Sequence, residues 1–122
     1  MTSTLSNDAR VVLITGASSG IGQACAIHLH QRGYHVFGTS RKAQSPGGSF
    51  TPIQMDVDDD ASVQHAIDQI IQQTGRLDVV VNNAGITFAG AIEDTSIEEA
   101  KAQFETNLFG VLHVCCAVLR AL

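Results

Sequence analysis

The residues of this sequence best suited to bind a phosphate are Gly16, Gly20 and Gly22, which follow a short apolar run at residues 11–14. A glycine turn between a buried strand and a helix brings free backbone N–H groups and the positive end of the helix dipole to one point. Because glycine has no Cβ, the chain can turn sharply at Gly16, a ligand can approach closely at Gly20, and the helix can pack near the strand at Gly22. The spacing favours a phosphate-binding turn, although an ordinary strand–turn–helix joint would use the same glycines.

Two basic residues, Arg41 and Lys42, follow the second apolar run, at residues 34–39. A dinucleotide-binding unit that prefers NAD carries an acidic residue here to accept hydrogen bonds from the ribose hydroxyls. The sequence has Ser40, Arg41 and Lys42 at this place and no acid. A guanidinium can bind a ribose 2′-phosphate in a forked geometry, and each charge-assisted bond contributes about 1.5–3 kcal/mol. We therefore expect NADP(H) rather than NAD(H), unless both cations are only solvated loop charges.

The elements that must position these residues alternate along the chain. Apolar runs predict strands at residues 11–14, 34–39, 51–55 and 77–82, the last buried on both faces. Helical spacing predicts helices at residues 21–32, 61–73 and from 96 towards 119. The loop at residues 43–49 could hold a further short helix. The alternation indicates an α/β fold with a doubly wound parallel sheet, in which ligands bind at the carboxyl ends of the strands.

Local signals support the helix assignments. The expected apolar faces are Ile21, Ala24, Cys25 and Leu29 in the first helix and Val63, Ala66, Ile67, Ile70 and Ile71 in the second. Gly33 and Gly75 are suitable stops, and Ser96 with Glu99 fits a capping box. The run Asp58-Asp59-Asp60 could suggest a cation site, but its place just before a helix favours capping of free N–H groups.

Composition bounds the remaining possibilities. The chain has 122 residues, 44% of them hydrophobic, which fits one modest domain, and residues 1–9 form a polar tail before it. The net charge of −5 opposes nucleic-acid binding. We expect no membrane-spanning run, no signal pattern and hence a cytoplasmic location. Three cysteines without ligand spacing are expected to be small buried hydrophobes, with no metal site.

Several motifs together resemble one family. The run Thr15-Gly16-Ala17-Ser18-Ser19-Gly20-Ile21-Gly22 resembles the Thr-Gly-x-x-x-Gly-x-Gly signature of short-chain dehydrogenases/reductases. Asn82-Asn83-Ala84-Gly85 matches the family's Asn-Asn-Ala-Gly, and residues 106–110 resemble the segment that carries its helix-borne catalytic asparagine. The resemblance covers about residues 10–122 and implies a Rossmann-like sheet.

The resemblance also implies roles for individual residues. The pyrophosphate and adjacent ribose would lie against Gly16, Ser18, Ser19, Gly20, Ile21 and Gly22. Asp56 and Val57 would hold adenine, and the ribose and nicotinamide would lie along Asn83, Ala84 and Gly85. Asn107 would anchor a water in a proton relay. Judged without the family, Asn107 is better explained as a polar helix residue that makes a local hydrogen bond.

One departure from the family pattern bears on activity. The family's proton donor is the tyrosine of a Tyr-x-x-x-Lys motif, preceded by a serine, whereas the single tyrosine here is Tyr34 and lacks that spacing. We therefore expect a truncated N-terminal, NADP(H)-binding segment of an oxidoreductase that transfers hydride to or from an alcohol or carbonyl, inactive by itself. The alternative is a non-catalytic nucleotide-binding or interaction protein. An open edge at residues 79–81 and an uncovered last helix predict self-association.

Overall fold

A computed structural model of the chain describes residues 8–42 and 48–122. Within them, four parallel strands form one sheet in the order β3-β2-β1-β4. The strands are β1 (Val11–Ile14), β2 (His35–Ser40), β3 (Thr51–Gln54) and β4 (Val79–Val81). The order reverses direction beside β1, because β2 and β3 lie on one side of it and β4 on the other. The predicted α/β fold with a doubly wound parallel sheet is confirmed.

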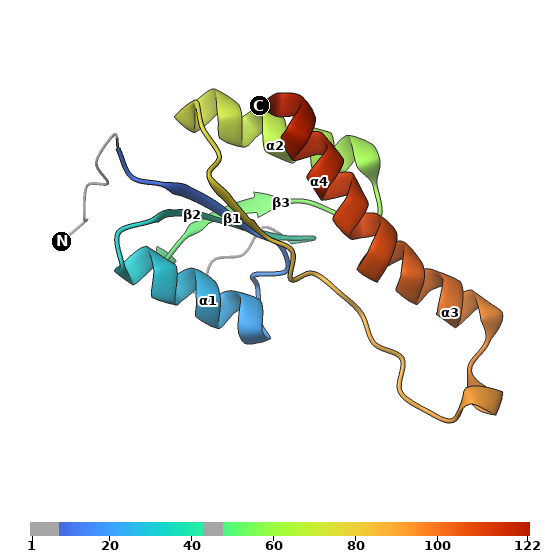
Figure 1. Cartoon of the computed structure of the whole chain (residues 1–122). Coiled ribbons are helices and arrows are strands. Elements are labelled where there is room, and N and C mark those ends of the chain that lie inside the picture. The colour runs from blue at the N-terminus through green and yellow to red at the C-terminus, as the bar shows by residue number, and fades with distance from the viewer. Residues whose placement is uncertain (1–7, 43–47) are drawn as a thin grey trace.

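Helices cover both faces of this sheet (Figure 1). Helix α1 (Gly20–Gln31) lies on one face, whereas α2 (Asp60–Thr74) and α4 (Gly110–Ala121) lie side by side on the other. A long connection leaves β4 and carries the short turn η2 (Ile92–Asp94). It leads to α3 (Ile97–Phe104) and a π-helical turn η3 (Glu105–Phe109), which joins α4 without a break.

The alternating pattern of β1 builds two apolar layers, because successive strand residues face opposite sides of a sheet. Val11 and Leu13 pack with Phe37 against α2 and α4, while Val12 and Ile14 pack on the α1 side. All four β1 residues are buried. Packing on both faces thus fixes the central strand β1. The glycine turn follows directly from its carboxyl end and is held in place by it.

The face of α1 that packs on the sheet differs from the predicted one. Ile21 is 83% exposed and Ala24 is also exposed, whereas Gly22 and Ala26 are buried. Cys25 and Leu29 are partly buried against the same layer, as expected. The prediction failed because helical spacing ranks residues by apolarity, whereas the close approach of α1 at Gly22 turns the side with Gly22 and Ala26 towards the sheet and leaves Ile21 and Ala24 outside.

The fourth strand is shorter and more exposed than predicted. It covers Val79–Val81 rather than residues 77–82, with Val79 exposed and Val80 and Val81 half-buried. The predicted burial on both faces is reached only in part, since Val80 packs partly buried on the α2 and α4 side and Val81 on the α1 side. β4 is also the last strand of the described sheet. The predicted open apolar edge is correspondingly present. The ends of the other elements differ from the predicted ends by one or two residues. Tyr34, for example, lies just before β2 rather than inside it.

The helical segment Ile97–Ala121 corrects a further expectation. It is long and apolar enough, by length and composition alone, to cross a membrane, and so the sequence does hold one such segment. A helix that packs in a protein core passes the same test. Here a stripe of residues faces the α2 side of the sheet: Thr106, Gly110, Val114, Ala117 and Val118 are buried.

The capping predictions are confirmed. Asp59 is the N-cap of α2, and its carboxylate accepts hydrogen bonds from the backbone N–H groups of Ala61 and Ser62. Ser96 and Glu99 form the capping box of α3, and Gly75 ends α2 with a left-handed φ of 73°. Among the cysteines, Cys25 and Cys115 are half-buried but Cys116 is exposed, which contradicts its expected burial. Most of the predicted tail (residues 1–7) and most of the loop 43–49 (residues 43–47) lie outside the described residues.

Candidate functional site

A cavity of about 490 Å³ opens at the carboxyl ends of the strands. Its walls come from the segments that follow β1, β2, β3 and β4, together with one residue of the π-helical turn. Nine of the predicted cofactor-binding residues line it: Gly16, Ser18, Ser19, Arg41, Lys42, Asp56, Val57, Ala84 and Gly85. The parallel sheet therefore brings together residues that lie up to about seventy positions apart in the sequence, as the strand-end argument expected.

The glycine turn has the geometry that its sequence predicts. Gly16 and Gly20 have φ angles of 67° and 59°, in the left-handed region that favours glycine. A Cβ on Gly16 would lie 2.9 Å from the Cα of Ala84, and one on Gly22 would collide with the carbonyl oxygen of Gly16 and with Asn83 Nδ2. A Cβ on Gly20 would meet no atom within 4 Å, which leaves open space on that side.

The first turn of α1 is suited to an anion. Ser19, which lines the cavity, is the N-cap in an extended conformation, and its side chain caps no backbone N–H of the helix. No acidic residue lies in the first turn. The first N–H groups of a helix have no acceptor within the helix, and its dipole adds positive potential there. The predicted residues Gly20, Ile21 and Gly22 form this turn without lining the cavity themselves.

Thr15 joins the ends of β1 and β4. Its buried hydroxyl accepts hydrogen bonds from the backbone N–H groups of Asn83, at 3.0 Å, and Ala84, at 2.9 Å. The Asn83 side chain donates from Nδ2 to the carbonyl oxygen of Gly16 at 3.1 Å. The amide of Asn83 therefore fixes the glycine turn from behind and does not line the cavity, whereas its neighbours Ala84 and Gly85 do.

Asn107 lies in the π-helical turn and holds the chain after β4. Its Oδ1 accepts a hydrogen bond from Ile86 N at 2.8 Å, and its Nδ2 donates to Ile86 O at 2.7 Å. The partner is twenty-one residues away, so the local hydrogen bond considered from the sequence is not what the structure has. Ile86 lines the cavity and Asn107 does not.

Charged residues form the wall near β2 and β3. The Arg41 guanidinium lies 3.9 Å from Asp56 Oδ1 through Nε and 3.6 Å from Asp58 Oδ2 through Nη2. The Asp56 backbone N–H donates to Ser62 Oγ, and the Asp58 backbone N–H donates to Asp56 Oδ1. Arg41 is thus loosely paired with two carboxylates, a contact that the sequence did not predict.

Comparison with known proteins identifies the family. The family model described as short chain dehydrogenase matches residues 10–122. The chain belongs to the short-chain dehydrogenase family. A 3-ketodihydrosphingosine reductase of Bacteroides thetaiotaomicron is 46% identical to it over 110 residues, which is 90% of this chain and 41% of that protein.

Solved structures of members of this family have the same fold as this chain. The ligand-free aldohexose dehydrogenase of Thermoplasma acidophilum superposes with a TM-score of 0.85 at 34% identity, covering 94% of this chain and 45% of that one. The structure described as ElxO with NADP bound has a TM-score of 0.82 at 32% identity, covering 92% of this chain and 50% of that one. The chain thus spans about half the length of the relatives it matches.

The cavity has a size and lining that suit part of a nucleotide cofactor. Its volume lies within the range of about 300–1,000 Å³ typical of small-molecule sites. The glycine turn leaves space at Gly20 where a side chain would otherwise stand, and the helix N-terminus beside it offers N–H donors. Arg41 and Lys42 supply positive charge at the far wall. These features suit the phosphates and the adenosine half of such a cofactor.

Five lining residues were not assigned a binding role from the sequence: Thr39, Ser40, Met55, Ile86 and Thr106. A signal existed for Thr106, because it is the polar member of the buried stripe that continues at Gly110 and Val114. Its hydroxyl donates to Asp58 Oδ1 at 2.8 Å. Thr39 and Ser40 could have been found from their place at the end of β2, just before Arg41.

Residues with shifted pKa values lie at the opposite, amino ends of the strands. The hydrogen bond from Arg76, followed by one from the Val11 backbone, lowers the pKa of Asp78 below its ordinary value, and the same bond raises the pKa of Arg76. Burial, followed by the charge of His30, lowers the pKa of His35 at the start of β2. Tyr34 adjoins this end as well, a strand length from the cavity.

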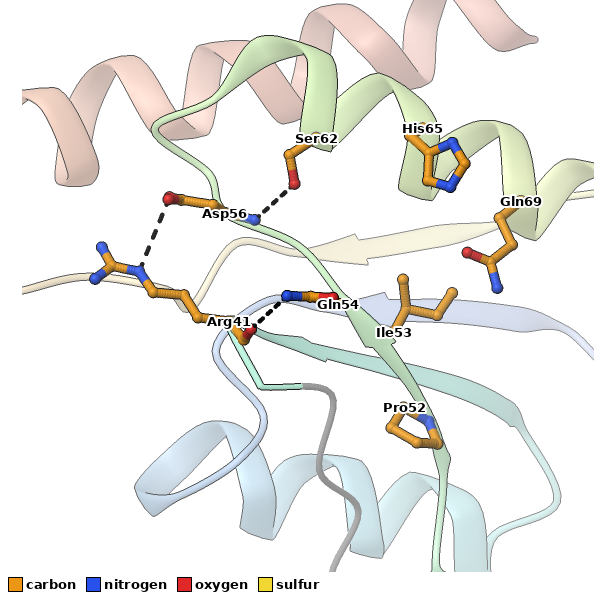
Figure 2. A pocket seen from close by; sticks show the side chains of 8 residues that line it. All are labelled: Arg41, Pro52, Ile53, Gln54, Asp56, Ser62, His65 and Gln69. Atoms are coloured by element: carbon orange, nitrogen blue, oxygen red, sulfur yellow. Dashed lines mark hydrogen bonds and ion pairs between the residues drawn. The ribbon is translucent and has the colours of Figure 1, made fainter.

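A second hollow, of about 540 Å³, runs along the outer side of β3 and the neighbouring face of α2 (Figure 2). Pro52, Ile53 and Gln54 of β3 form one side of it, and Ser62, His65 and Gln69 of α2 form the other. Arg41 and Asp56 belong to both hollows and separate them. In Figure 2 the Arg41 guanidinium turns towards Asp56 and away from His65 and Gln69.

Proposed function

We propose that this chain is the NADP(H)-binding N-terminal part of a short-chain oxidoreductase that transfers hydride between NADP(H) and an alcohol or carbonyl substrate. The observation that carries the proposal is the wall at the end of β2, where Ser40, Arg41 and Lys42 line the cavity. A carboxylate at this position would favour the free ribose hydroxyls of NAD(H), whereas the guanidinium and ammonium favour a 2′-phosphate.

Other residues of the cavity would each bind a different part of the cofactor. The N–H groups at the start of α1 and the hydroxyls of Ser18 and Ser19 would hold the pyrophosphate, while Asp56 and Val57 would bound the adenine. Ala84 and Gly85 would lie along the ribose and nicotinamide. Asn107 would keep the chain at Ile86 in place and serve the proton relay that the family resemblance implies. A related structure contains bound NADP, which supports this choice of cofactor.

Proton transfer is the part of the reaction that these 122 residues do not supply. A bound nicotinamide gives or accepts the hydride, and the substrate oxygen must exchange a proton with a nearby acid. The single tyrosine, Tyr34, precedes β2 at the amino end of the sheet, whereas the cavity lies at the carboxyl ends. We therefore propose that the chain by itself binds cofactor weakly and does not turn over.

Titration calorimetry with NADPH and NADH tests the cofactor assignment. Arg41→Ala should weaken NADPH binding roughly ten- to a hundredfold, because one or two charge-assisted bonds are lost, and should leave NADH binding nearly unchanged. Arg120→Ala is the matched control, since Arg120 is an exposed arginine on α4 that pairs with Asp60 at 3.9 Å, away from the cavity. Equal losses for both cofactors, or none, would refute the NADP(H) preference.

A second candidate is a non-catalytic nucleotide-binding or self-associating protein. It is favoured by the exposed edge strand β4 and by exposed apolar residues on α3 and α4, such as Phe104 and Leu119. The intact mass of the protein from its source separates the two. A mass clearly above 12.9 kDa supports the oxidoreductase, whereas a mass of 12.9 kDa with NADPH binding but no carbonyl reduction supports the second candidate.

A further inference from the structure

Asp58 connects two walls of the cavity without lining it. Its Oδ2 lies 3.6 Å from Arg41 Nη2, in the segment after β2, and its Oδ1 accepts the Thr106 hydroxyl at 2.8 Å from the π-helical turn. Both partners line the cavity, whereas Asp58 stands behind them with 32% of its side chain exposed. The Asp58 carboxylate is therefore placed to act on the cavity through Arg41 and Thr106.

The carboxylate is the fixed member of its pair with Arg41. Thr106 is 4% exposed and belongs to the buried stripe of the helix, so its hydroxyl cannot move far. The Asp58 backbone is held as well, because its N–H donates to Asp56 Oδ1 at 3.0 Å. Arg41, by contrast, has a long side chain that is 66% exposed. The guanidinium is thus the part that can move, and Asp58 and Asp56 determine where it rests.

We propose that Asp58 is a positioning residue that holds Arg41 at the cavity wall and competes with a ribose 2′-phosphate for its guanidinium. This inference rests on the proposed function and refines it, because it makes the preference for a 2′-phosphorylated nucleotide depend on a residue outside the cavity. The competition is weak, because the pair is 3.6 Å long and Arg41 is largely exposed. Such a pair changes the binding constant of the phosphate by only a fewfold. A dianionic phosphate can displace it.

Asp58→Asn isolates this role. Asparagine keeps an oxygen that can accept the Thr106 hydroxyl and keeps the backbone N–H that donates to Asp56, but it removes the negative charge next to Arg41. The matched control is Asp60→Asn, which makes the same change in net charge two residues further on. Asp60 is exposed in the first turn of α2 and pairs only loosely with Arg120, at 3.9 Å. Thermal unfolding of both variants checks that the fold is retained.

The probes are adenosine 2′,5′-bisphosphate and 5′-AMP, titrated into the full 122-residue chain and followed by amide shifts in NMR spectra. They differ by the 2′-phosphate, and NMR detects even millimolar binding. In Asp58→Asn the affinity for the bisphosphate should rise about two- to fivefold, while the affinity for 5′-AMP stays unchanged. In Asp60→Asn the affinities for both probes should stay as they are in the unmutated chain. In an Arg41→Ala background, Asp58→Asn should have no effect on either probe, because its partner is gone.

The outcomes separate the inference from the function on which it rests. If neither probe binds the unmutated chain, the proposed function fails and the inference falls with it. If both bind but Asp58→Asn leaves their affinity ratio as it was, the inference alone is refuted. A gain that persists without Arg41 would also refute it, since the effect would then be general electrostatics rather than the positioning of the guanidinium.

Discussion

Asn107 and Ile86 are joined by two hydrogen bonds that satisfy both backbone groups of Ile86, at 2.8 and 2.7 Å. The side-chain amide of Asn107 thus provides the acceptor and the donor that a neighbouring strand would provide in a sheet. The bonds fix the loop that carries Gly85 and Ile86 along the cavity wall, and a Cβ on Gly85 would lie 3.0 Å from Asn107 Oδ1. The residue expected to serve catalysis therefore also has a structural role.

Asn107→Ala should lower the free energy of unfolding by about 1–2 kcal/mol, because two partly solvated hydrogen bonds are lost. Urea denaturation measures this. Gln103→Ala is the control, since Gln103 makes a single longer bond to the same connection, from Phe88 N at 3.2 Å, and should cost less. An Asn107→Ala variant no less stable than Gln103→Ala would contradict the structural role.

Replacement of Gly22 and of Gly20 by alanine should lower the free energy of unfolding by different amounts. Gly22→Ala forces a Cβ against the Gly16 carbonyl oxygen and the Asn83 amide, so we expect destabilisation of about 2 kcal/mol or more. Gly20→Ala meets open space and suffers only the left-handed backbone at φ 59°, which costs about 1 kcal/mol. Chemical denaturation of the two variants compares them, and the reverse order would show that the turn is built differently.

The stability of the chain should depend on the protonation of His35. Its pKa is lowered from 6.5 by burial and by His30, and its ring stacks on Phe37 with 4.6 Å between centroids. The neutral form is therefore favoured in the folded state, and the unfolded chain binds more protons between the folded pKa and about 6.5. The resulting stabilisation is complete above pH 6.5 and is lost as the pH falls through the folded pKa.

Denaturation curves between pH 5 and pH 8 should show this effect in the unmutated chain. His35→Gln should flatten the pH dependence in that window, because the titrating group is removed. His30→Gln removes only the lesser cause and should reduce the dependence without abolishing it. An unchanged pH profile in His35→Gln would exclude His35 as the source.

The 122-residue chain should self-associate through its uncovered helix. Leu112 and Leu119 of α4 are 48% and 72% exposed, and β4 presents a free edge in the described sheet. Leu112→Lys should weaken association about tenfold, since burial of a leucine contributes about 1.5–3 kcal/mol. Sedimentation velocity measures this. Ile92→Lys makes the same kind of change in η2, away from α4, and should leave association unchanged.

The sequence was sufficient to predict the order of strands and helices and the end of the sheet at which the cavity lies. Glycine sterics located the turn at Gly16, helical spacing placed α2, and local caps at Asp59 and Ser96 marked where helices begin. These signals are short-range: each depends on residues within a few positions of one another. The rule that parallel strands present their carboxyl ends together then brought most of the predicted binding residues to one cavity.

The contacts that these residues make depend on how distant segments of the chain pack together. Thr15 contacts Asn83 across 68 positions, and Thr106 contacts Asp58 across 48, so neither pairing is visible in local pattern. The burial of Gly22 and Ala26 instead of Ile21 likewise depended on how closely α1 approaches the sheet. Strand order and helix placement set these distances, and they bring Arg41 close to the carboxylates of Asp56 and Asp58.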